Sequence, residues 1–243
     1  MKIAIIFVGT AKYAGFFDGY EKSINKYFLP DCEKDFFVFT DNPELAMFDK
    51  PNVNVIKIEH YGWPQITLHR FKFINSISDR LLDFDYVFFI DADLWPCVKI
   101  ETNDIIKSEY DYVGVQHPGF VDTIGTFETN TLSTANVLDG NYNLSIYRQG
   151  CFWGGKTAKV LEMVKTLDSS VDLDSKNGVM AIWHDESHMN KYFLQRNDKI
   201  YTLNPGYAMP QHGFENIKQK YKPMMIHLYK NMNEFPRFEG AKQ

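Results

Sequence analysis

The chain has 243 residues, 44% of them apolar, and a formal net charge of −5, which predicts one large core and a single domain over residues 1–243. Lysine and arginine are scattered, so the basic stripe needed to bind a nucleic-acid backbone is missing. No apolar run reaches the length of about 18 residues needed to span a membrane, the N-terminal run is too short for a signal peptide, and the three cysteines are widely spaced. We therefore expect a soluble protein of the reducing cytoplasm.

Strands and helices alternate along the first part of the chain. Residues 3–8 form an unbroken apolar run that predicts a buried strand, and residues 35–40 and 86–90 predict two more, while residues 53–59 alternate between apolar and polar. Residues 16–29 and 67–82 have helical spacing, and the second helix places Phe71, Ile74, Ile77 and Leu81 on one face. This alternation predicts an α/β fold with a mostly parallel central sheet flanked by helices.

The second part of the chain is less regular. Residues 156–166 and 186–195 predict helices, and a loop-rich stretch, residues 122–143, separates them from the first part. Charges are frequent and apolar anchors few from Lys218 onward. We therefore expect a mobile C-terminal tail.

Three polar segments directly follow predicted strands: Gly9-Thr10, Thr40-Asp41 and Asp91-Ala92-Asp93. Ligands of parallel sheets bind at the carboxyl ends of the strands, so we expect these segments on a common rim. Two carboxylates one residue apart suit Mn²⁺ or Mg²⁺ shared with the oxygens of a diphosphate. Such a triplet is more often a solvated turn, but its position after a strongly apolar strand favours a metal site.

A second candidate is Trp183-His184-Asp185-Glu186-Ser187-His188, which opens a predicted helix. The acids could simply be favoured by the helix dipole. His184 and His188 stand four residues apart, as in zinc proteases, but that motif requires glutamate directly after the first histidine, where Asp185 stands. We therefore favour a sugar-binding floor formed by Trp183 beside a positioned carboxylate over a zinc site.

A third candidate is Gln149-Gly150-Cys151-Phe152-Trp153-Gly154-Gly155. Its glycines allow a ligand or another strand to approach the backbone closely. The spacing matches neither a Walker loop nor a dinucleotide-binding loop. Alone, this pattern assigns no function.

These three segments resemble family 6 glycosyltransferases, as do three others: Phe37-Val38-Phe39-Thr40-Asp41, Gly62-Trp63-Pro64 and His117-Pro118-Gly119-Phe120. The segments follow one another in the same order as in that family, and the resemblance covers residues 3–230. That family includes the blood-group A and B transferases and the α1,3-galactosyltransferase. The resemblance implies a GT-A type fold and a retaining hexosyltransferase that uses Mn²⁺, with Mg²⁺ as the alternative. It further implies transfer of galactose or N-acetylgalactosamine from a UDP-sugar donor, in α1,3 linkage, to a galactose-containing acceptor glycan.

The resemblance also implies roles for individual residues. The implied donor-binding residues are Val8, Thr10, Tyr13, Asp91, Gln149, Gly150, Cys151 and Lys230. The implied metal ligands are Asp91 and Asp93. The implied catalytic residues are Glu186, Asp185 and Arg70. The implied acceptor-binding residues are His117, Thr126, Trp183 and His184.

Some of these roles carry further expectations. Glu186 matches the carboxylate beneath the anomeric carbon, and Arg70 and the helix start should keep it ionised at neutral pH. Gln149 and Cys151 occupy the positions that distinguish galactose from N-acetylgalactosamine, and Cys151, which is larger than glycine or alanine, should favour galactose. Lys230 resembles the residue that grips the diphosphate.

Two alternatives stay open. A nucleotidyltransferase that makes sugar nucleotides also uses an acidic metal pair, but Gly9-Thr10-Ala11-Lys12 is a poor version of its glycine-rich basic loop. A non-catalytic carbohydrate-binding protein would have little use for Asp91, Asp93 and Glu186 together. The acceptor is open as well, because Pro210 or Gln211 falls where vertebrate relatives have an acceptor-binding acid.

Overall fold

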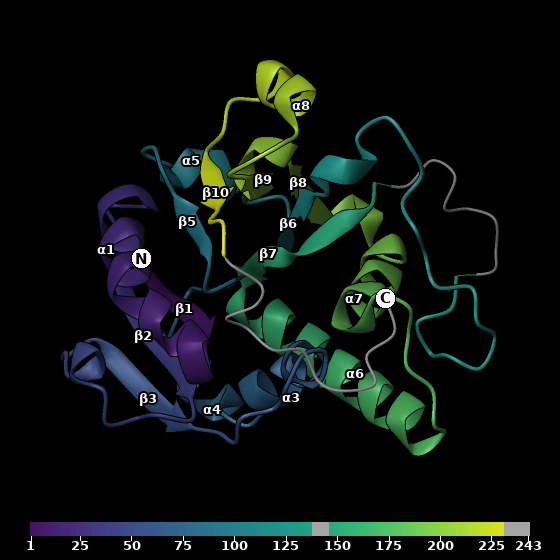
Figure 1. Cartoon of the computed structure of the whole chain (residues 1–243), viewed down its shortest axis with the longest axis horizontal. Coiled ribbons are helices and arrows are strands. Elements are labelled where there is room, and N and C mark those ends of the chain that lie inside the picture. Colours follow the sequence, from purple (N-terminus) through teal and green to yellow (C-terminus); the bar gives the residue numbers. More distant parts are fainter. Residues whose placement is uncertain (138–145, 231–243) are drawn as a thin grey trace.

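The computed structural model describes residues 1–137 and 146–230. Within these residues, a seven-stranded central sheet has the order β3-β2-β1-β4-β7-β6-β8 (Figure 1). Its strands are β1 (Lys2–Val8), β2 (Glu33–Thr40), β3 (Val53–Lys57), β4 (Tyr86–Ile90), β6 (Tyr112–Gln116), β7 (Arg148–Lys156) and β8 (Ile200–Leu203). The predicted α/β architecture is confirmed.

The sheet is mostly parallel, with β7 as the exception. The pairs β1–β2, β2–β3, β1–β4 and β6–β8 are parallel, whereas β7 runs antiparallel to both β4 and β6. The glycine-rich sequence of β7 did not identify it as a strand. At Gly154 the partner strand is so close that a Cβ atom would lie 2.4 Å from the Val87 carbonyl oxygen, so glycine here serves strand packing rather than ligand approach.

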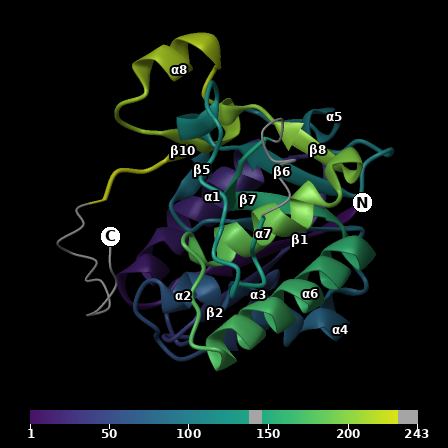
Figure 2. The same cartoon turned by 90° about the vertical axis from the view of Figure 1, so that its right-hand side faces the viewer.

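Helices cover both faces of the sheet because side chains of β1 alternate between two cores. Ile3, Ile5 and Phe7 point into the core shared with α1, while Ala4 and Ile6 point into the core under α3, α6 and α7 (Figures 1 and 2). The helices of the described residues are α1 (Phe17–Tyr27), α2 (Gln65–Leu68), α3 (Arg70–Asn75), α4 (Ser78–Leu81), α5 (Thr102–Ile105), α6 (Thr157–Lys176), α7 (His184–Leu194) and α8 (Glu215–Lys220). None of these helices combines the length and the hydrophobicity that crossing a bilayer requires.

The predicted helix over residues 67–82 is replaced by the three short helices α2, α3 and α4. Its apolar face is nevertheless correct, since Phe71, Ile74, Ile77 and Leu81 are all buried. At the first break the Arg70 Nε donates to the carbonyl of Thr67 at 3.2 Å, so this segment turns its arginine inward instead of extending as a regular helix. Helix α6 is longer than predicted and continues to Lys176.

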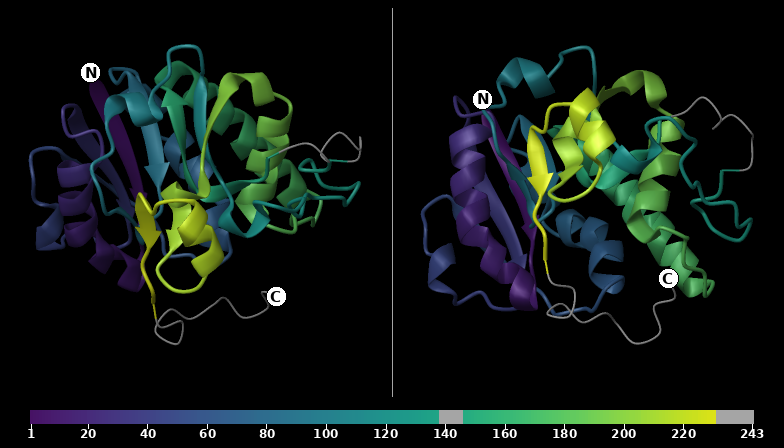
Figure 3. Two further views of the ribbon diagram at one scale, coloured as in Figure 1. Left: turned by 90° about the horizontal axis from the view of Figure 1, so that it is seen from above. Right: turned by 45° about the horizontal axis from the view of Figure 1, so that its top comes forward.

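A second, three-stranded sheet joins the C-terminal part of the described chain to the Asp91-Ala92-Asp93 segment. It has the order β5-β10-β9, with β5 (Leu94–Pro96), β9 (Met209–Pro210) and β10 (Met225–His227), and lies with α8 at one end of the central sheet (Figure 3). Leu228 donates its backbone N–H to the carbonyl of Asp93 at 2.9 Å. The last residues before Lys230 are therefore fixed beside Asp93.

This small sheet corrects one premise of the tail prediction. The segment after Lys218 was expected to have few apolar anchors, but Met225 is fully buried and β10 is paired on both sides. The part of that prediction that concerns residues 231–243 lies outside the described residues.

Candidate active site

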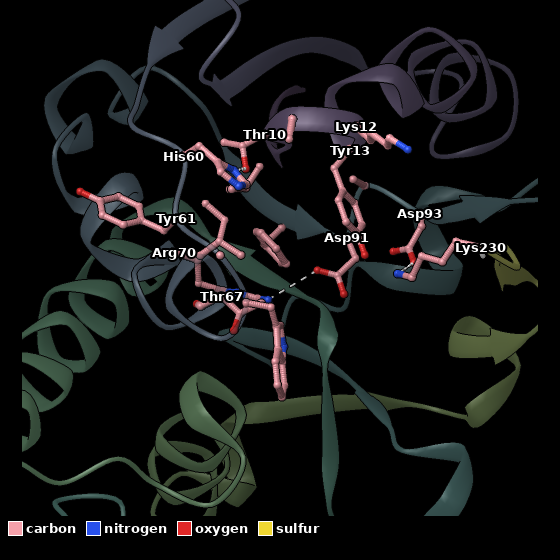
Figure 4. A pocket seen from close by; sticks show the side chains of 17 residues that line it. Thr10, Lys12, Tyr13, His60, Tyr61, Thr67, Arg70, Asp91, Asp93 and Lys230 are labelled. Atoms are coloured by element: carbon pink, nitrogen blue, oxygen red, sulfur yellow. Dashed lines mark hydrogen bonds and ion pairs between the residues drawn. The ribbon is translucent and has the colours of Figure 1, made fainter. Parts of the chain in front are cut away.

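A cavity of about 560 Å³ lies at the carboxyl ends of β1 and β4, where the sequence predicts a ligand-binding rim. Val8, Thr10 and Tyr13 line it together with Asp91, and the Ala11 N–H donates to Asp41 at 2.9 Å, which brings the second polar segment to the same rim. Figure 4 shows Thr10 on one side of the cavity, Asp93 on the other side and Asp91 between them. The volume suits a ligand of nucleotide size.

A smaller cavity of about 180 Å³ adjoins the first one. Both cavities share Trp63, Thr67, Arg70 and Asp91, so they meet at the start of α2 and α3. The remaining residues that line the smaller cavity come from two predicted motifs: Gln149, Gly150, Cys151, Trp183, His184, Asp185 and Glu186. The structure thus brings together segments that lie far apart in the sequence.

The guanidinium of Arg70 connects the two cavities. Its Nη1 donates to the carbonyl of Gly150 at 2.7 Å, its Nε lies 3.2 Å from Asp185 Oδ2, and its Nη2 lies 3.7 Å from Asp91 Oδ1. The Arg70 side chain is 7% exposed, and its Cζ stands 4.4 Å from the centre of the Phe89 ring. A buried arginine held on several sides keeps these carboxylates in fixed relative positions.

The acidic pair is electrically asymmetric. Burial and the adjacent Asp93 raise the pKa of Asp91 to about 6, against the opposing charge of Arg70. Burial also opposes ionisation of Asp93, but a hydrogen bond and the charge of His227, together with the Lys230 ammonium, lower its pKa below the ordinary value. Lys230 Nζ forms an ion pair with Asp93 Oδ2, and His227 Nδ1 lies 3.7 Å from Asp93 Oδ1.

The donor set of this pair fits a hard divalent cation. Asp91 and Asp93 both offer carboxylate oxygens to the larger cavity, and Asp91 also lines the smaller one. A cluster of three or more histidine, cysteine or acidic side chains placed to hold a metal together is absent from the described residues. Two carboxylates suit a cation of the Mg²⁺ or Mn²⁺ type, which completes its shell with water and the phosphates of a ligand. His184 and His188 face different surroundings, because His184 lines the smaller cavity while His188 is buried against Asp174.

Glu186 belongs to the first turn of α7, yet its side chain does not cap that helix. Its Oε2 accepts the N–H of Gly150 in β7 at 2.7 Å. The N–H of Trp183, the residue directly before α7, is instead satisfied by Ser187 Oγ at 2.9 Å. The carboxylate is therefore turned toward the smaller cavity, and simple helix capping does not explain its position.

The expectation that Glu186 is ionised at neutral pH is met only in part. Removal from water raises its pKa to about 7, and the negative charge of Asp185 acts in the same direction. The hydrogen bond from Gly150 and the charge of Arg70 lower the pKa, but by less. The buried Tyr147 hydroxyl lies near this carboxylate, and burial and the Glu186 charge raise the pKa of the phenol. A carboxylate with a pKa near neutrality in a cavity is typical of an active site.

Two of the predicted acceptor residues lie outside both cavities. Thr126 is exposed on the loop after β6, and the His117 ring packs at an angle against Phe120 and Tyr147, with ring centres 4.8 and 6.1 Å away. Burial and the charge of His227 lower the pKa of His117 to about 4, so its ring is neutral at pH 7. Its Nδ1 accepts the Gly119 N–H at 2.9 Å, which places the ring proton on Nε2.

Sequence reasoning assigned no role to several residues at the site. The larger cavity is also lined by His60, Tyr61 and Trp63, and His60 Nδ1 lies 2.9 Å from Thr10 Oγ1. The Gly62-Trp63-Pro64 segment was one signal for this wall, since it belongs to the family resemblance. Tyr147 and His227 lie in segments without a recognisable motif, and only the fold brings them to Glu186 and Asp93.

A nucleotide-sized cavity that ends at an acidic pair and continues into a smaller cavity bordered by carboxylates is the arrangement expected of a glycosyltransferase. Comparison with known proteins agrees. The family description Glycosyltransferase family 6 matches residues 1–234, so the chain belongs to this family. It is a hexosyltransferase.

Individual relatives support the same assignment. The chain is 32% identical over 221 residues to the O-antigen biosynthesis glycosyltransferase WbnI of Escherichia coli, covering 90% of this chain and 93% of that protein. It is 28% identical over 213 residues to the globoside alpha-1,3-N-acetylgalactosaminyltransferase 1 of Gallus gallus, covering 80% of this chain but only 58% of that protein. It is 26% identical over 238 residues to the histo-blood group ABO system transferase 2 of Rattus norvegicus, covering 92% and 69%. The nucleotidyltransferase and lectin alternatives gain no support.

Proposed function

We propose that this protein is a retaining transferase of GT-A type that moves galactose or N-acetylgalactosamine from a UDP-sugar to a galactose-containing glycan, in α1,3 linkage. The observation that carries the proposal is the junction at Arg70, where the larger cavity, ending at Asp91, meets the smaller cavity that contains Glu186. A nucleotide in the larger cavity would place its sugar in the smaller one.

In this scheme the uridine would lie against Val8, Thr10 and Tyr13, while Asp91 and Asp93 would hold Mn²⁺ or Mg²⁺ in the same cavity. The cation would offset charge on the departing diphosphate. Lys230 would add a second positive charge there, because its ammonium already lies beside Asp93.

Glu186 then supports the sugar as positive charge develops at its anomeric carbon, either as a transient nucleophile or as an electrostatic partner. Arg70 and Gly150 position this carboxylate and its neighbour Asp185. Trp183 and His184 line the smaller cavity, and because Trp183 is exposed to solvent, an acceptor sugar would enter beside it. Fixed placement of this kind lowers the entropic cost of reaction.

One experiment tests the proposal as a whole. The purified protein is incubated with UDP-galactose or UDP-N-acetylgalactosamine, Mn²⁺ and a panel of galactosides, and the mass and linkage of each product are determined. We expect one added hexose or N-acetylhexosamine in α1,3 linkage on a galactose. Transfer from another nucleotide, or a β linkage, would contradict the proposal.

The donor sugar is expected to be galactose. Cys151 is 3% exposed and lines the smaller cavity, so its thiol should crowd the acetamido group of N-acetylgalactosamine. Wild-type protein should show a higher kcat/KM with UDP-galactose, and Cys151→Gly should shift the ratio toward UDP-N-acetylgalactosamine by roughly tenfold, the range for a small steric difference in a pocket. A wild-type preference for UDP-N-acetylgalactosamine would show that the steric argument is wrong.

Lys230 should strengthen binding of the donor and weaken binding of the cation. In Lys230→Met the donor KM should rise by about tenfold, because one charged contact to the diphosphate is lost. Without donor, Mn²⁺ should bind more tightly to the variant, because the ammonium that pairs with Asp93 is gone. Deletion of residues 230–243 should raise the donor KM in the same way and lower turnover.

The matched control for Lys230 is Lys220→Met, which removes an exposed lysine that pairs with Asp122 on the surface at 3.5 Å. Its kinetics and Mn²⁺ affinity should match those of the wild type. An unchanged donor KM in Lys230→Met would remove this residue from the mechanism.

A further inference from the structure

The segment that leads into α7 decides where Asp185 and Glu186 lie, because both acids belong to the first turn of that helix. Its last two residues project into solvent, with Ile182 50% and Trp183 44% exposed. His184 then adopts a left-handed backbone with φ of 51°, a conformation uncommon outside glycine that persists only when surrounding contacts impose it. The hydrogen bonds of this backbone are therefore important for the position of the helix.

One of these bonds comes from a distant loop. The N–H of Ile182 donates to Glu128 Oε2 at 2.6 Å, across 54 positions of sequence. Glu128 is only 6% exposed, and its other oxygen, Oε1, accepts the N–H of Asn130 at 2.6 Å. The Glu128 carbonyl accepts the N–H of Val137 at 2.8 Å. One carboxylate thus joins its own loop to the entrance of α7 through short, charge-assisted hydrogen bonds.

The same loop is also fixed to α6 and reaches toward α7. Asp174 in α6 is 2% exposed and accepts a hydrogen bond from Ser133 Oγ at 2.6 Å and another from the Thr134 N–H at 2.7 Å. Its Oδ2 lies 3.6 Å from Nε2 of His188 in α7. Figures 1 and 2 show the described part of this loop, up to residue 137, beside α7. These contacts attach the loop that carries Glu128 to α6, so the Glu128 carboxylate is held in place.

On its N-terminal side the loop approaches Glu186 by a second route. The Phe127 ring contacts the Tyr147 ring, with centres 5.1 Å apart, and the Tyr147 hydroxyl lies near the Glu186 carboxylate. Thr126, which the family resemblance assigns to the acceptor, precedes Phe127 directly. Phe127 and Glu128 thus contact Tyr147 and the segment before α7, the two structures that surround the Glu186 carboxylate.

We propose that Glu128 is a positioning residue: by holding the Ile182 N–H it fixes the start of α7, and so aims Glu186 at the smaller cavity. The catalytic consequence rests on the function proposed above, whereas the effect on the position of α7 does not.

The test compares two buried carboxylates. Glu128→Ala removes the acceptor of the Ile182 N–H, and Glu128→Gln is a second variant that keeps one oxygen in place should the alanine variant fold poorly. The control is Glu21→Ala, which removes a carboxylate of similar burial (9% exposed) on α1, across the sheet from α7, where it pairs with Lys50 at 2.8 Å. Hydrogen–deuterium exchange is followed over residues 179–189, and kcat and UDP affinity are measured per folded protein.

We expect faster exchange over residues 179–189 in both Glu128 variants, and not in Glu21→Ala. The kcat for transfer should fall at least tenfold in Glu128→Ala, since a displacement of about 1 Å at a reacting group can cost on the order of a hundredfold. UDP affinity should stay within about twofold, because the larger cavity is built without Glu128.

Exchange over residues 179–189 equal to that of the wild type would overturn the positioning role, as would a kcat unchanged from the wild type. A different outcome separates the two proposals. If exchange rises as expected but the wild-type protein transfers no hexose, Glu128 still positions α7, and the proposed function is the part that fails.

Discussion

Glu186→Gln should lower turnover by roughly two orders of magnitude or more, a loss of about 2.7 kcal/mol at the transition state, while donor affinity is maintained. Glutamine keeps the shape of the side chain, and its carbonyl oxygen can still accept the Gly150 N–H that now lies 2.7 Å from Oε2. Only the negative charge is lost, and that charge is what a developing positive sugar requires. Turnover and donor affinity measured on one preparation test this directly.

The same variant should not be less stable, and this distinguishes a catalyst from a structural residue. The pKa of Glu186 in the folded protein, about 7, lies above the ordinary value of 4.5, so the folded protein holds this proton more tightly than the unfolded chain. Its contribution to stability is therefore fully present below about pH 4.5 and lost as pH rises through about 7. Glutamine does not titrate, so the variant does not lose this stability. Its thermal midpoint should therefore rise relative to that of the wild type as the pH is raised from about 4.5 to about 7. A lowered midpoint with intact turnover would mean that Glu186 is structural.

Asp93→Asn is expected to lose most of its transfer activity, again by roughly two orders of magnitude, because metal stabilisation of a leaving group is worth several kcal/mol. A neutral amide is a weaker ligand for a hard cation than a carboxylate. The substitution also removes the charge that pairs with Lys230. Direct titration with Mn²⁺, followed by electron paramagnetic resonance, should show weaker binding even without donor.

Asp79→Asn is the matched control for Asp93, since it makes the same chemical change on the exposed surface of α4. It should bind Mn²⁺ and turn over like the wild type. Full wild-type activity in excess chelator would contradict metal dependence, whatever the behaviour of the variants.

The strongly periodic parts of the fold could be predicted from the sequence, and the reason is local. β4 was predicted with its observed bounds, Tyr86–Ile90, because an apolar run of that length has few alternatives. β7 was not recognised, because three of its nine residues are glycines whose purpose becomes visible only beside β4 and β6. The short strands β5, β9 and β10 lack a pattern long enough to recognise.

The candidate site likewise contains residues that the sequence could predict and residues that it could not. Asp91, Asp93 and Glu186 could be singled out because they stand in motifs, and the structure brings them to two cavities that meet. Tyr147, His227 and Glu128 could not, because a single tyrosine, histidine or glutamate in a loop or short strand has no periodicity. Their positions depend on contacts across dozens of residues, such as the 54 that separate Glu128 from Ile182.

The central sheet is assembled from two consecutive blocks of sequence that meet only where β4 pairs with β7. Strands β1 to β4 come from residues 2–90 and strands β6 to β8 from residues 112–203. Except for Lys230, all residues that line the larger cavity come from the first block and the acidic segment after it. The second block contributes Gln149 to Cys151 and Trp183 to Glu186 to the smaller cavity. Under the proposed function, substitutions in the second block should change sugar and acceptor preference while nucleotide binding stays intact, and chimaeras of related enzymes should be joined between residues 96 and 112.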